Sequence, residues 1–231
     1  MTTLGCIQSS YLPWRGYFDI IRQSDIFVFH DDIQYTKQDW RNRNQLKTPG
    51  GLMWITVPVI KETTKGPIDL VEIDNRQNWG LKHWRQIYNN YNKAPYFAEF
   101  KDFFEDCFLS TKWEFLYQLN TYLIINICQF LNITTKFLNS RDLNISGHKT
   151  DRIVSMCNIL EADRYLSGPS AQDYIEANKF DANNINLEYM RYVYPEYQQL
   201  YGTFCHYTTI IDPLFNCGPN SETIFGTTNY V

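Results

Sequence analysis

Two arginines alternate with polar and aromatic residues in the segment Trp40-Arg41-Asn42-Arg43-Asn44. If this segment is extended, Arg41 and Arg43 face one side and the other three face the opposite side, because successive side chains of a strand alternate. Two guanidinium groups on one face suit bidentate binding of phosphate or carboxylate, and asparagine amides can bind a sugar hydroxyl or a base edge. The segment therefore predicts a site for an anionic, partly polar ligand. In the alternative interpretation both arginines pair with nearby aspartates and only stabilise the fold.

Two of those aspartates, Asp31 and Asp32, directly follow the apolar run Asp25 to His30. That run has the length and composition of a buried strand, and groups just beyond the carboxyl ends of parallel strands line the ligand crevice. Paired carboxylates at such a place can bind Mg²⁺ or act as a general base, since one acid raises the pKa of the other. The alternative is a turn or helix-capping role. No third carboxylate has a suitable spacing, so we predict no metal site and no cofactor.

The loop after the first predicted strand contains Gln8, Ser9, Ser10 and Tyr11. In doubly wound folds this loop often holds phosphate, so Gln8 and Tyr11 are candidate ligand contacts. The chain has neither a G-x-G-x-x-G pattern nor a Walker A motif there. Dinucleotide binding and P-loop chemistry are therefore disfavoured.

A second basic cluster, which includes Lys149 and Arg152, precedes and enters a predicted helix. Exposed N–H groups, the helix dipole and two cations together indicate an anion site, whereas the alternative is an ordinary solvated helix start. His83, on a predicted helix, and His30, at a strand end, are candidate acid–base groups. Lone histidines are also common structural residues, so both interpretations stay open.

A strand–helix–strand unit is predicted over Leu4 to Gln8, Trp14 to Gln23 and Asp25 to His30, which implies parallel pairing. Further strands are predicted over Leu52 to Val57, Ile68 to Asp74, Thr135 to Leu138, Arg164 to Ser167 and Asn186 to Tyr194. Further helices are predicted over Asn78 to Lys93, Phe97 to Leu109, Lys112 to Asn132, Lys149 to Ala162 with Thr150 as N-cap, Ala171 to Lys179, and Asp212 to Asn216. We expect one domain over residues 1–231: an α/β fold with a largely parallel, Rossmann-like sheet and a helical insertion around 78–132.

The composition excludes several classes of protein. A net charge of −4 opposes non-specific binding to nucleic acid or anionic membranes. The six cysteines form no C-x-x-C pair and lie mostly among apolar neighbours, which indicates buried thiols in a reducing compartment. The N-terminus has no signal-peptide pattern, and polar residues interrupt the apolar stretch from Trp113 to Leu131. We therefore expect a cytoplasmic protein that does not enter the membrane.

The chain resembles the WbqC-like protein family over nearly its whole length. In the N-terminal part the resemblance rests on Gln8, Tyr11-Leu12-Pro13-Trp14, Gly16-Tyr17-Phe18, Asp31, Gln34-Tyr35, Trp40, Asn42-Arg43-Asn44, Trp54 and Val57-Pro58-Val59. Later matches include Lys149-Thr150, Arg152, Tyr165-Leu166-Ser167-Gly168, Tyr174 and Ile210-Ile211-Asp212. Two departures from the family pattern are Ser9 in place of proline and Pro213 in place of leucine. The first unit also resembles adenylyl-transferring nucleotidyltransferases, but it lacks their two-histidine motif.

The family resemblance implies a role in bacterial O-antigen and other surface-polysaccharide biosynthesis. It favours a transferase that modifies a nucleotide-linked amino sugar by acyl or aminoacyl transfer. Arg41, Arg43 and Lys149 or Arg152 would neutralise phosphates, and Trp14, Tyr35 or Trp40 would stack on base or sugar. Asp32 or His83 would accept the amine proton, with Asp31 as a further candidate. The alternatives are a non-catalytic carbohydrate- or nucleotide-sugar-binding protein and an enzyme that uses aminoacyl-tRNA as donor.

Overall fold

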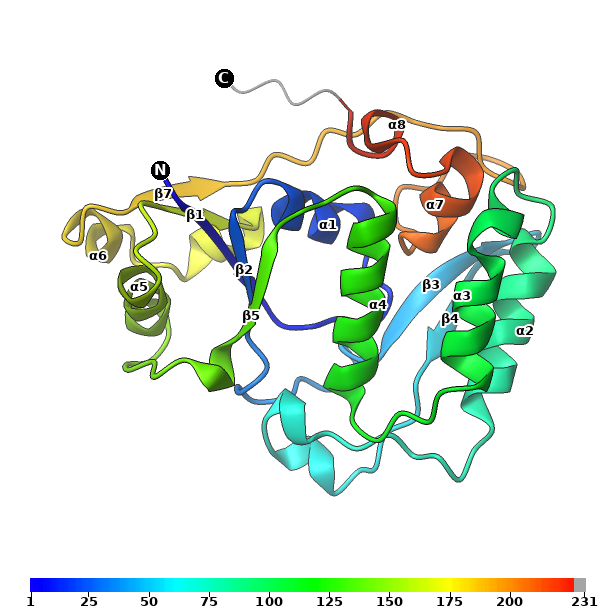
Figure 1. The fold of residues 1–231 in the computed structure, drawn as a ribbon, viewed down its shortest axis with the longest axis horizontal. Helices are drawn as coiled ribbons and strands as arrows, with labels where there is room; N and C mark the ends of the chain where they lie inside the picture. Colours follow the sequence, from blue (N-terminus) through cyan, green and yellow to red (C-terminus); the bar gives the residue numbers. More distant parts are fainter. Residues whose placement is uncertain (227–231) are drawn as a thin grey trace.

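The computed structural model describes residues 1–226, which are built around a five-stranded sheet (Figure 1). Its strands lie in the order β5-β2-β1-β6-β7, and every pair of neighbours is parallel. The strands are Thr3–Ile7 (β1), Ile26–Phe29 (β2), Lys136–Asn139 (β5), Arg164–Ser167 (β6) and Asn186–Tyr189 (β7). The predicted α/β class with a parallel sheet is confirmed.

The strand order reverses direction between β1 and β6. The chain first runs outward from β1 through helix α1 (Arg15–Arg22) to β2 and then to β5. It then crosses back so that β6 pairs with the free side of β1. Loops that leave β1 and β6 therefore diverge to opposite faces of the sheet, and a crevice opens where such loops separate. The first strand–helix–strand unit has the parallel pairing that the sequence predicts.

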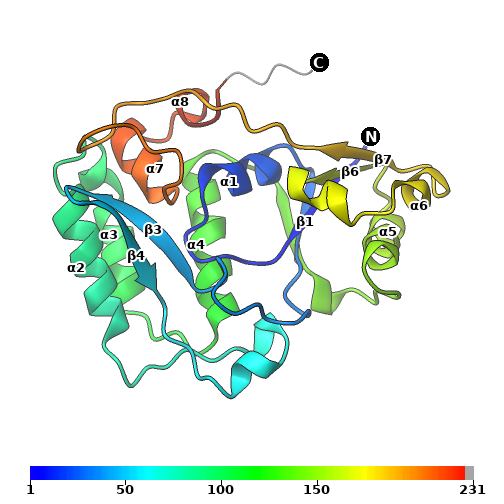
Figure 2. The same cartoon turned by 180° about the vertical axis from the view of Figure 1, so that it is seen from behind.

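Helices cover both faces of the sheet. Helices α5 (Thr150–Ile159) and α6 (Ala177–Asp181) lie on one face, whereas α1 and α4 (Leu116–Phe130) lie on the other (Figures 1 and 2). Successive side chains of β2 point to opposite faces of the sheet, so they pack into the cores on both sides. Phe27 and Phe29 join the larger core beneath α1 and α4, whereas Val28 joins the smaller core beneath α5 and α6.

The predicted helical insertion lies between β2 and β5. It contains α2 (Trp79–Tyr91) and α3 (Phe97–Leu109), followed by α4. Helix α4 begins at Leu116 and not at Lys112, because the N–H of Leu116 still donates to the carbonyl of Val71, at 2.8 Å.

An antiparallel hairpin precedes these helices and lies apart from the parallel sheet (Figure 2). Its strands are β3 (Arg43–Thr48) and β4 (Gly51–Thr56). The sequence predicts β4, but β3 is too polar for its strand character to be recognised. Its buried Leu46 faces the core, whereas most of its other side chains are polar.

The predicted strand from Ile68 to Asp74 is wrong. Two short 3₁₀ helices, Thr63–Lys65 (η1) and Ile68–Leu70 (η2), occupy this region, and only isolated bridges follow them. The backbone N–H groups of Ile68 and Asp69 donate to the carbonyls of Ile33 and Asp31, at 3.0 and 2.9 Å. These donors are therefore committed to the segment after β2 and do not form a ladder.

The predicted helix from Ala171 to Lys179 is also wrong, because the chain breaks there. Residues Pro169–Asp173 form a 3₁₀ helix (η4) and α6 follows separately. At the break, the N–H of Glu176 donates to the hydroxyl of Thr150, at 3.2 Å. Helix α5 begins at Thr150, so Lys149 occupies the N-cap position that the sequence predicts for Thr150.

Beyond β7, which ends at Tyr189 and not at Tyr194, residues 190–210 form a strap. The strap returns along α1 toward α7 (Ile211–Cys217) and α8 (Ser221–Phe225) (Figure 1). Arg15 ties the strap to α8 by donating to the carbonyl of Pro195 in the strap at 2.9 Å and to that of Ile224 in α8 at 3.1 Å. Helix α7 confirms the short helix predicted near Asp212, whereas α8 is not predicted.

Candidate functional site

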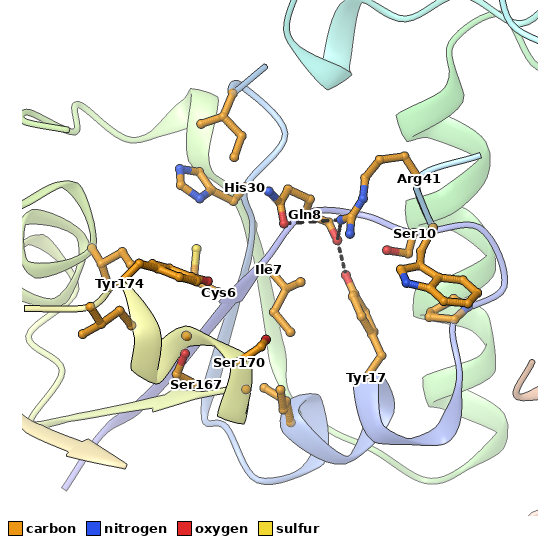
Figure 3. Close-up of a pocket in the computed structure, with 18 of the residues that line it drawn as sticks. Cys6, Ile7, Gln8, Ser10, Tyr17, His30, Arg41, Ser167, Ser170 and Tyr174 are labelled. Carbon is orange, nitrogen blue, oxygen red and sulfur yellow. Dashed lines mark hydrogen bonds between the residues drawn. The ribbon is translucent and has the colours of Figure 1, made fainter. Parts of the chain in front are cut away.

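A cavity of about 640 Å³ lies at the reversal of the strand order (Figure 3). Its size is typical of sites that hold a small molecule. Its walls come from the carboxyl ends of β1, β2 and β6, the start of α5, helix α1 and the strap. The polar lining residues include Gln8, Ser10, His30, Arg41, Asn44, Lys149, Thr150, Ser167 and Ser170. The aromatic lining residues are Trp14, Tyr17, Trp40, Tyr165, Tyr174, Tyr192 and Tyr207.

The electrostatic character of the cavity differs from that of the whole chain. The chain carries a net charge of −4, yet within residues 1–226 the lining of this cavity includes Arg41 and Lys149 and no aspartate or glutamate. A cation in a cavity with partly apolar walls attracts anions more strongly than one on an open surface. The arrangement therefore favours an anionic ligand.

Arg41 is held against the loop that follows β1. Its Nη1 donates to the carbonyl oxygen of Gln8 at 3.0 Å, and the Tyr17 hydroxyl donates to the same oxygen at 3.0 Å (Figure 3). Its Nε lies 3.7 Å from the carboxylate of Asp39 and makes no hydrogen bond to the described part of the chain. Arg41 thus makes the ion pair of the alternative interpretation and also lines the cavity, and the anion site stays a prediction.

Aromatic rings form two parts of the wall. Trp14 contacts Tyr192 of the strap edge to face, with ring centroids 4.9 Å apart. Trp40 stacks on Trp54 of β4 with centroids 5.5 Å apart and is 45% exposed. Indole faces that remain accessible can stack on a nucleobase or the apolar face of a sugar.

Lys149 enters the cavity wall from a strained backbone position. Its φ of 50° and ψ of −123° fall in a region that glycine tolerates and other residues rarely adopt. Such strain is often found at functional sites, because the surrounding structure must hold it in place. Lys149 and Thr150 also stand at the start of α5, where unpaired backbone N–H groups favour anions.

The two adjacent aspartates, Asp31 and Asp32, have different partners, and neither of them lines the cavity. Asp31 is buried, and its Oδ1 accepts a hydrogen bond from the N–H of Ser9 at 2.7 Å. Burial raises the pKa of Asp31 to about 6, although the Ser9 bonds and Arg41 oppose this effect. Asp32 accepts hydrogen bonds from Ser140 and Arg152. Burial alone would raise the pKa of Asp32, but these two bonds outweigh it and hold the pKa below its usual range.

Of the other predicted site residues, the structure brings Gln8, Trp14, Trp40, Arg41, Asn44 and Lys149 together around the cavity. Asn44 mainly stabilises the backbone of the loop after β1. Its amide donates to the carbonyl of Leu12 at 2.7 Å and stabilises a residue whose φ is 44°. Arg152 lies in the first turn of α5 and contacts His30, a lining residue.

The remaining predicted residues lie away from the cavity. His83 is buried beside Trp79 and bonds the Tyr11 hydroxyl, with 2.8 Å between Oη and Nδ1. Burial lowers the pKa of His83 to about 4. Tyr35 packs in the larger core, and the Asn42 amide donates to the carbonyl of Val57.

Arg43, the partner of Arg41 in the predicted pair, is also directed elsewhere. It donates to the carbonyl of Gln38, and its guanidinium lies 4.5 Å from the ring centroid of Trp54. The two guanidinium groups therefore have separate partners.

Sequence reasoning missed the contribution of β6 and the strap. Ser167 is the last residue of β6 and Ser170 follows it, and Tyr192 and Tyr207 come from the strap. The sequence contains a signal for β6, because the predicted strand from Arg164 ends on the polar residue Ser167 and Ser170 follows soon after. Only the pairing of β6 with β1 shows that these serines lie beside the loop after β1. The cavity also contains Cys6, whose thiol is no ready nucleophile because burial raises its pKa strongly.

No helix within residues 1–226 is both long and apolar enough to cross a membrane. All six cysteines, which lie within that range, are free, and four of them are buried. In the same range no three His, Cys, Asp or Glu side chains gather in a way that would hold a metal ion.

The fold and the cavity together define a doubly wound α/β protein with a crevice, lined by Arg41 and Lys149, at the reversal of its strand order. A family model for the WbqC-like protein family matches residues 8–224, and the chain belongs to this family. It is also similar to a Mycobacterium tuberculosis protein named "Uncharacterized protein Rv1507c". The two are 42% identical over 220 residues, which cover 94% of this chain and 95% of the relative. No solved structure matches the chain.

Proposed function

We propose that this protein is a cytoplasmic transferase that modifies a nucleotide-linked amino sugar in bacterial surface-polysaccharide biosynthesis, as for an O-antigen or a lipopolysaccharide. The proposed reaction is the transfer of an acyl or aminoacyl group to the sugar amine. The observation that carries this proposal is the cavity itself. It lies at the reversal of a parallel sheet, and the part of the chain that the structure describes gives it two cations, no carboxylate and accessible indole rings.

Each part of a nucleotide sugar finds a complementary group there. Arg41 and Lys149 supply positive charge for a diphosphate. Trp14 and Trp40 offer aromatic faces for the base or the sugar ring. The hydroxyl groups of Ser10, Ser167 and Ser170 and the amide of Gln8 can bind sugar hydroxyls.

One observation favours a second candidate, a non-catalytic protein that binds a nucleotide sugar. Amine acylation needs a group that accepts the amine proton. Asp31 is buried beneath the loop, Asp32 is paired with Arg152, and His83 lies in the core. Among the described residues, no carboxylate lines the cavity, and Nε2 of the lining residue His30 already accepts a hydrogen bond from Arg152. A proton acceptor would therefore have to come from the substrate, from water or from rearrangement.

A thermal-shift screen of the purified protein tests the proposal. UDP, dTDP, UDP-glucosamine and dTDP-linked amino sugars are compared with the free sugars at equal concentration. We expect stabilisation by the nucleotide sugars and none by free glucosamine. If no nucleotide diphosphate or nucleotide sugar shifts the midpoint, the proposal is overturned.

Mass spectrometry then separates the two candidates. The stabilising nucleotide sugar is incubated with the protein and with acetyl-CoA, other acyl-CoA esters or aminoacyl-tRNA as donors. A mass increase of the sugar that depends on the protein identifies a transferase. Binding without any modification by these donors favours the non-catalytic alternative, and loss of activity after ribonuclease treatment would identify the tRNA-dependent reaction.

A further inference from the structure

His30 stands at the end of β2 and forms part of the cavity wall (Figure 3). Its ring contacts Arg152 of α5, whose Nε lies 3.0 Å from Nε2 of the imidazole. An arginine side chain carries only donors and stays protonated at any ordinary pH. In this contact Arg152 therefore donates, and Nε2 of His30 accepts through its lone pair.

This contact determines where the single proton of a neutral imidazole lies. If Nε2 is the acceptor, the proton is on Nδ1. A doubly protonated ring would direct its Nε2–H against the N–H of Arg152. The contact thus selects one of the three forms that a histidine can adopt.

Arg152 is itself fixed by a second contact. Its Nη2 pairs with the carboxylate of Asp32, which also accepts a hydrogen bond from the Ser140 hydroxyl. Both partners of this ion pair are largely buried, with side-chain exposures of 18% and 24%. The charged groups that act on His30 are Arg152 from α5 and Asp32 from the segment after β2. Burial and the charge of Arg152 lower the pKa of His30 to about 4, so the neutral ring persists at neutral pH.

The other ring nitrogen, Nδ1, remains available. No residue within 1–226 hydrogen-bonds to it, and it is not among the side-chain atoms sealed from solvent without a partner. Because His30 lines the cavity, the Nδ1–H is open to whatever occupies that space.

We propose that His30 is a neutral hydrogen-bond donor in this cavity: Arg152 fixes its proton on Nδ1, and Nδ1–H binds an acceptor oxygen of the ligand. Arg152 is then a positioning residue, and Asp32 holds Arg152. The identity of the ligand, an oxygen-rich nucleotide sugar, rests on the proposed function. In that setting His30 polarises a carbonyl, phosphoryl or hydroxyl oxygen, and it does not accept the amine proton.

The tautomer is tested in the free protein by two-bond ¹H–¹⁵N NMR spectra of ¹⁵N-histidine-labelled samples. The chain has four histidines, and the signal that disappears in His30→Asn belongs to His30. We expect a neutral ring protonated on Nδ1 from pH 5 to 8. A ring protonated on Nε2, or a cationic ring at pH 7, overturns the proposal.

The role of Arg152 is tested with Arg152→Met, which keeps much of the side-chain length and removes the donor. We expect His30 to become a mixture of tautomers with a titration midpoint closer to 6.5, the ordinary value for histidine. Asp32→Asn is the second variant, in case Arg152→Met does not fold, and should loosen the same preference. An unchanged spectrum in a folded variant overturns the positioning role.

The donor role is tested by binding of UDP-glucosamine, measured by calorimetry. The Asn amide reaches about as far as Nδ1 of histidine, whereas the Gln amide reaches about as far as Nε2. We therefore expect His30→Asn to retain most of the affinity, and His30→Gln and His30→Phe to lose about tenfold, the effect of one hydrogen bond. Equal affinities in all three variants overturn the donor role. If the wild-type protein binds no nucleotide sugar, the proposed function and this donor role fail together, while the NMR spectrum still decides the tautomer.

Discussion

The backbone N–H of Ser9 donates to Oδ1 of Asp31 at 2.7 Å, which joins the loop after β1 to the loop after β2. The buried carboxylate thus supports the loop after β1 from beneath and does not line the cavity. Its second oxygen is buried and has no hydrogen-bond partner among residues 1–226. A buried carboxylate with one unpaired oxygen stabilises the fold best when it is protonated.

Asp31→Asn should change the pH dependence of stability. Burial raises the pKa of Asp31 to about 6 from the ordinary 3.8, so the folded protein binds this proton more tightly than the unfolded chain. The stability that Asp31 contributes is therefore present below pH 3.8 and is lost as the pH rises through about 6. Between pH 5 and 7 we expect wild type to lose about 1 kcal/mol relative to Asp31→Asn. Urea denaturation at both pH values measures this, and parallel behaviour of the two proteins would show that Asp31 is already ionised at pH 5.

Arg41→Ala and Arg43→Ala form a matched pair, since the two residues have the same type and nearly the same position. Only Arg41 lines the cavity, whereas Arg43 lies over Trp54. We expect Arg41→Ala to weaken binding of UDP about 10- to 100-fold, which corresponds to one charge-assisted hydrogen bond. Arg43→Ala should leave the affinity within threefold of wild type. Calorimetry gives both values, and equal losses in the two variants would mean that the arginines act together on the ligand.

Lys149→Gly should stabilise the protein and weaken UDP binding. The φ of 50° is unfavourable for lysine and acceptable for glycine, so the substitution should raise the free energy of unfolding by about 1 kcal/mol. It also removes one of the two cations of the cavity and should weaken UDP binding. Lys149→Ala is the control, because it removes the cation and keeps the Cβ atom. A glycine variant no more stable than the alanine variant would contradict the strain argument.

Tyr11→Phe should destabilise the protein without affecting ligand binding. The neutral His83 ring has one N–H, which it donates to the backbone carbonyl of Thr56. Its Nδ1 therefore accepts a hydrogen bond from the Tyr11 hydroxyl. Loss of the hydroxyl leaves a buried acceptor unpaired, which costs about 1–3 kcal/mol. Chemical denaturation measures this cost, and UDP affinity should be unchanged because neither residue lines the cavity. A large loss of affinity with normal stability would place the pair in the binding site after all.

Much of the fold could be predicted from local pattern alone. The apolar run that contains Phe27, Val28 and Phe29 indicates a strand buried on both faces, and this is what β2 forms. Helices α2 and α3 follow from apolar residues at helical spacing, such as Trp84, Ile87 and Tyr91. Prediction failed where non-local hydrogen bonds decided the outcome. Ile68 and Asp69 have strand-like neighbours, but their N–H groups are taken by the segment after β2.

The candidate site shows the same division. The sequence itself determined that polar and aromatic residues follow the strands of a parallel sheet, because strand ends can be recognised from composition. It therefore identified Gln8, Trp14, Trp40, Arg41 and Lys149, all of which line the cavity.

Only the tertiary structure decided which of the candidate residues share a space. Strand order is set by packing between distant segments, and the pairing of β6 with β1 brings Ser167 and Lys149 to the loop after β1. Side-chain direction is likewise set by neighbours far along the chain. Arg152 reaches His30 and Asp32, and His83 turns into the core toward Tyr11. The sequence thus determined the chemical groups available to this protein, and folding decided which of them meet.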